Sequence, residues 1–198
     1  MSYHGTIPIV KKFLLELPRP VSVLEVGVDR GVTFLSIVTF LARAKEKFTA
    51  LGIDIKVQEQ VSIMLQNLDR SPQQMAFLLE KNSLEALPDL ASKGMKFDVI
   101  FLDGDHNYHT VSRELELIGS LLTNEGIIVI DDYEGRWSER DLWYAERPGY
   151  EDVTIASSKV DTEKHGVKPA VDEWLAKHPE WKKGAPVGGE PVILTRHA

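Results

Sequence analysis

Residues 22–31 read SVLEVGVDRG, and this stretch decides the class of fold. Its first part is a short apolar run rich in valine, which is typical of a strand buried inside a parallel sheet. Gly27 permits a tight turn where the run ends. Gly31 opens a segment at about residues 31–45 in which apolar side chains recur at helical spacing. The stretch therefore predicts a strand, a glycine turn and a helix, the first unit of an α/β fold.

The same alternation of apolar runs and helical patterns continues along the chain. Further apolar runs predict strands at residues 49–53, 74–79, 97–102, 127–130 and 192–195. Helical patterns predict helices at residues 108–122 and 168–177 and a leading helix within residues 1–20. This order indicates a mostly parallel sheet with helices on both faces. No linker divides the chain, so we expect a single domain over residues 1–198, with a lid or insertion at residues 133–150.

Composition limits the classes of function. The 198 residues include 23 lysines and arginines against 30 aspartates and glutamates, a net charge of −7. This balance argues against a nucleic-acid partner, which needs a concentrated basic face. The absence of cysteine excludes disulfides, thiolate zinc sites and a cysteine nucleophile. No signal peptide and no apolar run of the ~20 residues that a membrane helix needs is visible, so we expect a cytoplasmic protein without a membrane partner.

A second signal lies at the ends of two later strands. The run at residues 97–102 leads into Asp-Gly-Asp-His-Asn-Tyr at residues 103–108, and the run at 127–130 leads into Asp131 and Asp132. Ligands bind at the carboxyl edge of open α/β sheets. Carboxylates on neighbouring strands repel each other unless a cation or a proton lies between them, and Mg²⁺ prefers oxygen ligands. Successive strand residues point to opposite faces, so Asp131 and Asp132 can share a metal only if the chain leaves strand geometry between them.

The pattern Glu-x-Gly-x-x-x-Gly at residues 25–31, followed by an acid that ends the second strand, resembles class I S-adenosylmethionine-dependent methyltransferases. The resemblance implies a Rossmann-like, mostly parallel seven-stranded sheet. It also implies that the glycine loop holds the amino-acid end of the cofactor, that Asp54 accepts hydrogen bonds from the ribose hydroxyls, and that Asn82 and Ser83 contact the adenine. The implied cofactor-binding residues are Glu25, Gly27, Gly31, Asp54, Asn82, Ser83 and Asp103.

The acidic motifs narrow this resemblance. Asp-Gly-Asp-His-x-Tyr at residues 103–108, Asp-Asp-Tyr at 131–133 and the segment at 166–174 are similar to small-molecule O-methyltransferases of the macrocin O-methyltransferase type. The resemblance implies catalytic roles for His106, as general base, and Asp103. It implies a Mg²⁺ site, or a site for another hard divalent cation, made by Asp103, Asp131 and Asp132. It further implies a small hydroxylated acceptor and a homodimer.

Other readings of the same residues remain open at this point. His106 could be a surface histidine at a helix start, Asp105 could cap the following helix, and Asp131 and Asp132 could form a solvated turn. The leading hypothesis is metal-assisted O-methylation of a small hydroxylated molecule. A nicotinamide-dependent oxidoreductase is an alternative, since Asp54 also suits the ribose of NAD, but the third glycine of the dinucleotide motif is missing. A non-catalytic cofactor-binding module is the other alternative.

Overall fold

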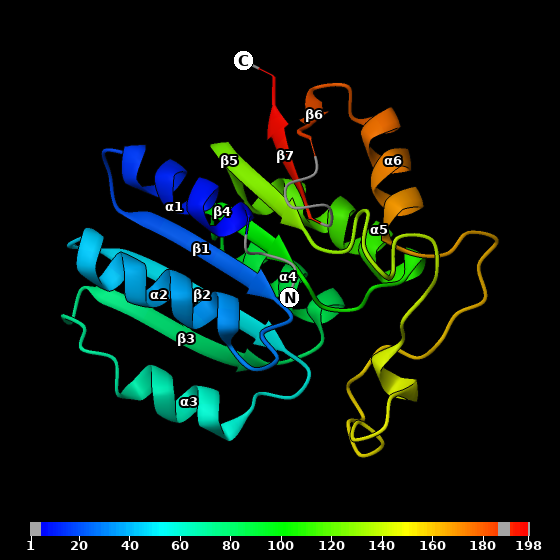
Figure 1. Cartoon of the computed structure of the whole chain (residues 1–198), viewed down its shortest axis with the longest axis horizontal. Helices are drawn as coiled ribbons and strands as arrows, with labels where there is room; N and C mark the ends of the chain where they lie inside the picture. The colour runs from blue at the N-terminus through cyan, green and yellow to red at the C-terminus, as the bar shows by residue number, and fades with distance from the viewer. Residues whose placement is uncertain (1–4, 186–190, 198) are drawn as a thin grey trace.

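The computed structural model describes residues 5–185 and 191–197, which form one sheet covered by helices on both faces (Figure 1). The strands are β1 (Val21–Val26), β2 (Phe48–Asp54), β3 (Gln74–Glu80), β4 (Phe97–Leu102), β5 (Leu122–Ile130), β6 (Trp181–Lys183) and β7 (Val192–Arg196). Their order across the sheet is β3-β2-β1-β4-β5-β7-β6. β1 to β5 pair in parallel, and β7 runs antiparallel to both β5 and β6. The predicted seven-stranded, mostly parallel sheet is therefore confirmed.

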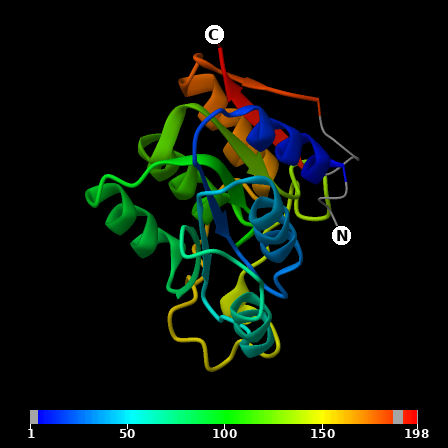
Figure 2. The same ribbon diagram turned by 90° about the vertical axis from the view of Figure 1, so that its left-hand side faces the viewer.

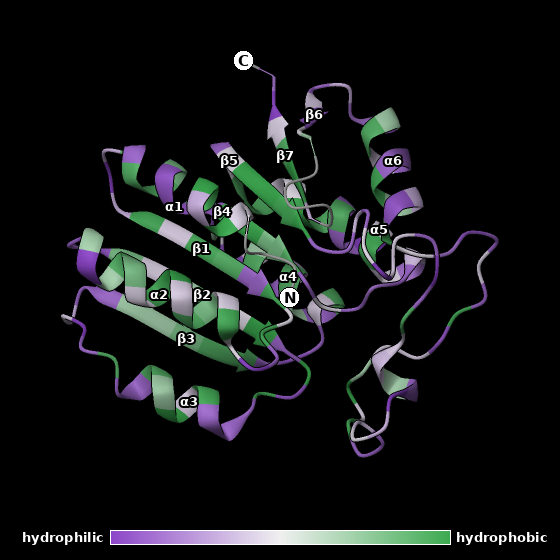
Figure 3. Ribbon diagram, viewed as in Figure 1, coloured by the Kyte–Doolittle hydropathy of each residue, from purple (hydrophilic) through white to green (hydrophobic). Residues whose placement is uncertain are grey.

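The helices divide into two layers. They are α1 (Thr6–Glu16), α2 (Val32–Ala44), α3 (Glu59–Gln66), α4 (Ser83–Ser92), α5 (Tyr108–Ile118) and α6 (Val167–Lys177). The first three cover one face and the last three cover the other, as Figures 1 and 2 show. Each layer closes a separate apolar cluster against the sheet, and the strands are correspondingly hydrophobic (Figure 3). None of the described helices is long and apolar enough to cross a membrane.

Three elements and two boundaries differ from the sequence prediction. α3, α4 and β6 were not predicted, because α3 and β6 are short and α4 has Pro88 in its interior. The helix expected over residues 108–122 ends at Ile118, and the strand expected at 127–130 begins already at Leu122, after a 3₁₀ turn. Leu122 pairs with Phe97 of β4, so pairing with the sheet overrides the helical spacing there.

The long connection between β5 and α6 leaves the body of the fold. It contains a short 3₁₀ turn, η2 (Tyr144–Glu146), and extends past the carboxyl ends of the parallel strands (Figure 1). Its start is fixed, because the N–H groups of Val167 and Lys168 donate to the carbonyls of Trp137 and Ser138. The connection is thus placed to cover the edge of the sheet where the acidic motifs lie.

Candidate active site

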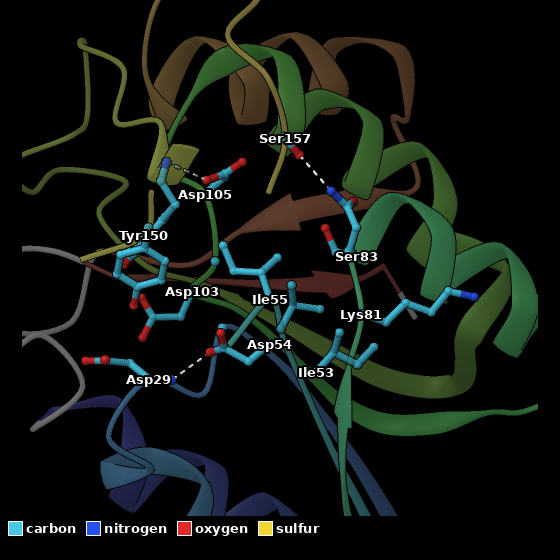
Figure 4. A pocket seen from close by; sticks show the side chains of 15 residues that line it. Asp29, Ile53, Asp54, Ile55, Lys81, Ser83, Asp103, Asp105, Tyr150 and Ser157 are labelled. Atoms are coloured by element: carbon cyan, nitrogen blue, oxygen red, sulfur yellow. Dashed lines mark hydrogen bonds between the residues drawn. The ribbon is translucent and has the colours of Figure 1, made fainter. Parts of the chain in front are cut away.

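A pocket lies at the carboxyl edge of β1, β2 and β4, and the β5–α6 connection forms its outer wall. Figure 4 shows Asp54, Asp103 and Ser83 on the sheet side, with Tyr150 and Ser157 of the connection opposite. The pocket is lined by Val26, Gly27, Asp29, Ile53, Asp54, Ile55, Lys81, Asn82, Ser83, Asp103, Gly104, Asp105, Tyr144, Tyr150 and Ser157. Of the predicted cofactor residues, Glu25 and Gly31 are outside this lining.

The glycine loop requires both of its glycines. Gly27 has φ +85°, and a Cβ there would lie 2.1 Å from the carbonyl oxygen of Asp103. Gly31 has φ +74° and begins α2, where a Cβ would lie 2.7 Å from Cγ1 of Val61. Glycine alone adopts this backbone region without steric cost and leaves room for these neighbours. The loop can therefore bring the ends of β1 and β4 into contact.

Asp54 fixes the shape of this loop. Its Oδ2 accepts hydrogen bonds from the N–H groups of Val28 and Asp29, each at 2.8 Å, and its Oδ1 accepts one from Lys56 at 2.9 Å. Burial raises the pKa of Asp54, and the three N–H donors partly offset that effect. Burial also raises the pKa of Glu25 well above its usual range, and the charge of Asp54 adds to it. Asp54 thus faces the pocket, whereas Glu25 is buried behind it.

Asn82 links the sheet side of the pocket to its outer wall. Its side-chain oxygen accepts from the N–H of Leu84 at 2.9 Å and caps α4. Its amide nitrogen donates to the carbonyl of Ile155 at 2.8 Å and to Oγ of Ser157 at 3.1 Å. The two pocket residues Asn82 and Ser83, which the resemblance assigns to the adenine, therefore lie where the β5–α6 connection closes over the site.

The structure brings together Asp103, His106 and Asp131, each offering one ligand atom, and these atoms all lie within 4.8 Å of one another. These side chains lie close together because β1, β4 and β5 are neighbours in the sheet. Beyond the strand ends, the N–H of Asp103 donates to Val26 and the N–H of Asp131 donates to Leu102, which continues the ladder. Burial, followed by the charge of Asp131, raises the pKa of Asp103 well above its usual range. Such a carboxylate pair is stabilised by a cation.

Asp132 lies beside this group but not within it. Its φ of +54° takes the chain out of strand geometry directly after Asp131, as metal sharing by adjacent acids requires. Its Oδ2 is 3.7 Å from Nδ1 of His106. Its carboxylate also accepts backbone hydrogen bonds from Arg136 and Trp137, which partly offset the rise that burial causes in its pKa. Of the three predicted metal ligands, Asp103 and Asp131 therefore lie together with His106, and Asp132 lies on the other side of the histidine ring.

His106 is buried, with only 6% of its surface exposed, so the surface-histidine interpretation is wrong. Its Nε2 is 3.6 Å from Oδ1 of Asp103, opposite the ring atom that faces Asp132. Burial lowers the pKa of His106, and the charges of Asp132 and Asp131 work in the opposite direction. A neutral imidazole held among carboxylates can accept a proton.

Several residues of the site were not identified from the sequence. Asp105 lines the pocket and accepts from the N–H of Tyr144 at 3.4 Å, and burial raises its pKa to about 6. The helix cap considered for Asp105 is supplied by Asn107, which accepts from the N–H of Thr110 at 2.7 Å. Asp141 accepts from the N–H groups of Tyr108 and Gly166 and so anchors the connection. Only the aromatic residues after Asp132 gave a sequence signal for this wall, and they did not indicate which side chains face the pocket.

One comparison identifies a family, and another finds solved structures of the same fold. A family model described as a methyltransferase domain matches residues 24–133, more than half of the chain. CalS11, a TDP-rhamnose 3′-O-methyltransferase of calicheamicin biosynthesis, has a TM-score of 0.63 at 15% identity, over 96% of this chain and 76% of that chain. PaMTH1, a methyltransferase from Podospora anserina solved with bound SAH, has a TM-score of 0.58 at 18% identity, over 97% and 76%.

MycE, a methyltransferase of mycinamycin biosynthesis solved with Mg, SAH and mycinamycin VI, gives a TM-score of 0.57 at 15% identity. The alignment covers 96% of this chain, which spans about half (48%) of MycE. No curated protein sequence matches the chain. At these identities the structural likenesses show the shared fold.

Proposed function

The chain belongs to the methyltransferase domain family and is an S-adenosylmethionine-dependent methyltransferase, and we propose that it methylates an oxygen of a small hydroxylated molecule with the help of a hard divalent cation. The observation that carries this proposal is the meeting of Asp103, His106 and Asp131 beside the pocket. A methyltransferase acting on a hydroxyl must remove a proton from a weak nucleophile. This group of side chains supplies carboxylate oxygens for a cation and an imidazole for the proton.

The donor set fits a cation of the Mg²⁺ class. Asp103 and Asp131 come from adjacent strand ends, and their mutual repulsion is the reason that a positive charge is favoured between them. Asp132 would complete the acidic edge from beyond His106. The presence of Mg in the MycE complex supports the same choice. When bound, the cation would lower the pKa of the acceptor hydroxyl and fix its oxygen.

His106 is the general base in this proposal. Burial favours its neutral form, and Asp132 lies 3.7 Å from Nδ1 and can stabilise the imidazolium formed when the ring accepts a proton. The hydrogen bond from Leu142 to the backbone carbonyl of His106, at 3.0 Å, ties the base to the β5–α6 connection. Asp103, 3.6 Å from Nε2, orients the other side of the ring.

The pocket along the glycine loop is the proposed S-adenosylmethionine site, and the cofactor supplies the methyl group. Gly27 and Asp29 of the glycine loop line the part of the pocket where the amino-acid end would lie. Asp54 would bind the ribose hydroxyls, because its Oδ1 accepts a single N–H and retains a lone pair. Asn82 and Ser83 line the opposite end, where the adenine would lie. Glu25 is buried behind the glycine loop and would influence the cofactor only through that loop.

We also propose that the β5–α6 connection, including residues 133–150, is a lid. Tyr144, Tyr150 and Ser157 of this connection line the pocket from its outer side. We expect the connection to move outward when the cofactor enters. It is joined to Asn82 by two hydrogen bonds, at Ile155 and Ser157, and to Asp105 by one from the N–H of Tyr144, and a ligand can replace these contacts.

The acceptor is proposed to be small, because CalS11 and MycE are named for a sugar and a macrolide pathway. The oxidoreductase alternative is not favoured, since the family is that of methyltransferases and the third dinucleotide glycine is absent. A homodimer and a cytoplasmic location remain predictions, which sedimentation and cell fractionation would test.

Calorimetry and a methyl-transfer assay test the function together. We expect S-adenosylhomocysteine to bind in the micromolar range and NAD not to bind. We expect EDTA to abolish transfer and added Mg²⁺ to restore it. Asp131→Asn should lower transfer by about 100-fold while S-adenosylhomocysteine still binds, because the change affects the cation site. Asp69→Asn is the matched control, since Asp69 is exposed in the turn before β3. NAD binding without thioether binding would refute the cofactor, and EDTA-resistant transfer by Asp131→Asn would refute the cation.

A further inference from the structure

We propose that Arg147 of the lid binds an anionic group of the acceptor, so that the preferred acceptor is a hydroxylated molecule carrying a carboxylate or a phosphate. This inference rests on the proposed function, because it concerns the acceptor end of the same site. It is independent of which hydroxyl is methylated.

Arg147 is held at the rim of the pocket by its neighbours on the lid. It follows the 3₁₀ turn η2, and its N–H donates to the carbonyl of Tyr144 at 3.0 Å. Its guanidinium carbon lies 4.8 Å from the centroid of the Tyr144 ring, which lines the pocket. Tyr144 in turn packs edge-on against Tyr150, with ring centroids 5.0 Å apart. The guanidinium is therefore fixed above the aromatic wall of the site.

The segment that carries Arg147 also lies beside the proposed base. Leu142 donates its N–H to the carbonyl of His106 at 3.0 Å, and Tyr144 donates its N–H to Oδ1 of Asp105 at 3.4 Å. The guanidinium stacked on Tyr144 therefore belongs to the part of the lid that is tied to the catalytic motif.

Within the described part of the chain, Arg147 has no carboxylate within 4.0 Å and no side-chain hydrogen bond. Two lysines that flank the pocket are already engaged. Lys56 donates to the carbonyl of Gly149 at 2.7 Å and lies over the Tyr150 ring, and Lys81 pairs with Asp89. The donors of Arg147 are available to a ligand.

The negative charge around Arg147 is the reason to expect that this arginine binds an anion. The edge carries many aspartates, which are Asp29, Asp54, Asp103, Asp131 and Asp132. Such an edge repels an anionic acceptor unless a cation offsets the repulsion at the place where the anion lies. A guanidinium matches a carboxylate or a phosphate with two parallel hydrogen bonds. A neutral acceptor would leave this group without a partner.

Matched pairs of acceptors test the inference. Methyl transfer from S-adenosylmethionine would be measured by mass spectrometry in the presence of Mg²⁺. Acceptor binding would be measured by calorimetry on protein saturated with S-adenosylhomocysteine and Mg²⁺. One pair is 3,4-dihydroxybenzoate and 3,4-dihydroxybenzyl alcohol; the other is glucose 1-phosphate and methyl glucoside. The two pairs separate a carboxylate from a phosphate as the preferred anion. The variants are Arg147→Gln and Arg147→Lys, with Arg140→Gln as the control, because Arg140 also lies over an aromatic ring, that of Trp137, but away from the pocket.

We expect the anionic member of at least one pair to be preferred. Arg147→Gln should weaken the binding of that member by about 10- to 100-fold, as expected for the loss of a hydrogen bond to a charged group. The neutral member and the thioether affinity should not change, and Arg147→Lys should restore part of the preference. Equal binding of both members, or a preference that survives Arg147→Gln, would overturn the inference. Loss of thioether affinity in Arg147→Gln would assign the arginine to the cofactor instead. Failure of the wild-type protein to bind S-adenosylhomocysteine would refute the proposed function itself.

Discussion

Glu114 makes the stability of this protein depend on pH in a way that one substitution can remove. The side chain is 1% exposed on α5, and burial raises its pKa from 4.5 to about 8. Between these pH values the native state keeps a proton that the unfolded chain has lost. The stabilising contribution is therefore complete below pH 4.5 and is lost as pH rises toward 8. The slope is about 1.4 kcal/mol per pH unit, or roughly 5 kcal/mol over the interval.

Glu114→Gln retains the shape of the side chain and cannot ionise. We would measure the free energy of unfolding by urea titration from pH 5 to pH 8. We expect it to fall more steeply with pH for the wild type than for the variant, and the difference in slope should correspond to about one proton. Glu116→Gln is the matched control, since Glu116 is exposed on the same helix. Equal slopes for the wild type and Glu114→Gln would refute the argument, because they would show that Glu114 is already ionised in the native state or that water reaches it.

Two further predictions concern packing, one at the glycine loop of the site and one at the opposite end of β4. Gly27→Ala should destabilise the protein by about 2–4 kcal/mol in urea titration, because its Cβ would lie 2.1 Å from the Asp103 carbonyl oxygen, whereas Gly119→Ala, where no atom lies within 4 Å, should be neutral. Asp98→Ala should cost about 3–5 kcal/mol by the same measurement, because its buried carboxylate accepts from Arg19 at 2.6 Å and from the N–H of Ser22 at 2.8 Å. Glu125→Ala, the exposed partner of Arg19 at 3.6 Å, should change stability by less than about 0.5 kcal/mol, and a comparable loss in the two variants would contradict the burial argument.

The sequence predicted the elements whose own residues carry a clear pattern of apolar side chains. The strand at Phe97–Leu102 was predicted to the residue, because an unbroken apolar run is what burial on both faces requires. α4 was missed because Pro88 contradicts helix propensity, although the N-cap of Asn82 and packing on the sheet stabilise the helix. Propensity is a weak signal where tertiary contacts contribute more.

In the site, too, some residues could be predicted from the sequence and others could not. The edge positions of Asp103 and Asp131 follow from strand order, and the motif made His106 a candidate, so these residues were predictable. The contacts of Asn82 with Ile155 and of Asp141 with Gly166 join segments 73 and 25 residues apart. Such contacts depend on the path of a long connection, which has no periodicity to read.

The group of buried acids at the sheet edge also has a consequence for the lifetime of the protein in a cell. Glu25 and Asp103 are held close together in a site of low polarity, where burial and their mutual repulsion make the ionised forms costly. Ligands that bind only the native state stabilise it in proportion to their concentration. Proteases act mostly on opened chains, so their rate of attack follows the fraction of molecules left empty. The supply of methyl donor and of divalent cation would then set how long each copy survives, as well as how fast it works.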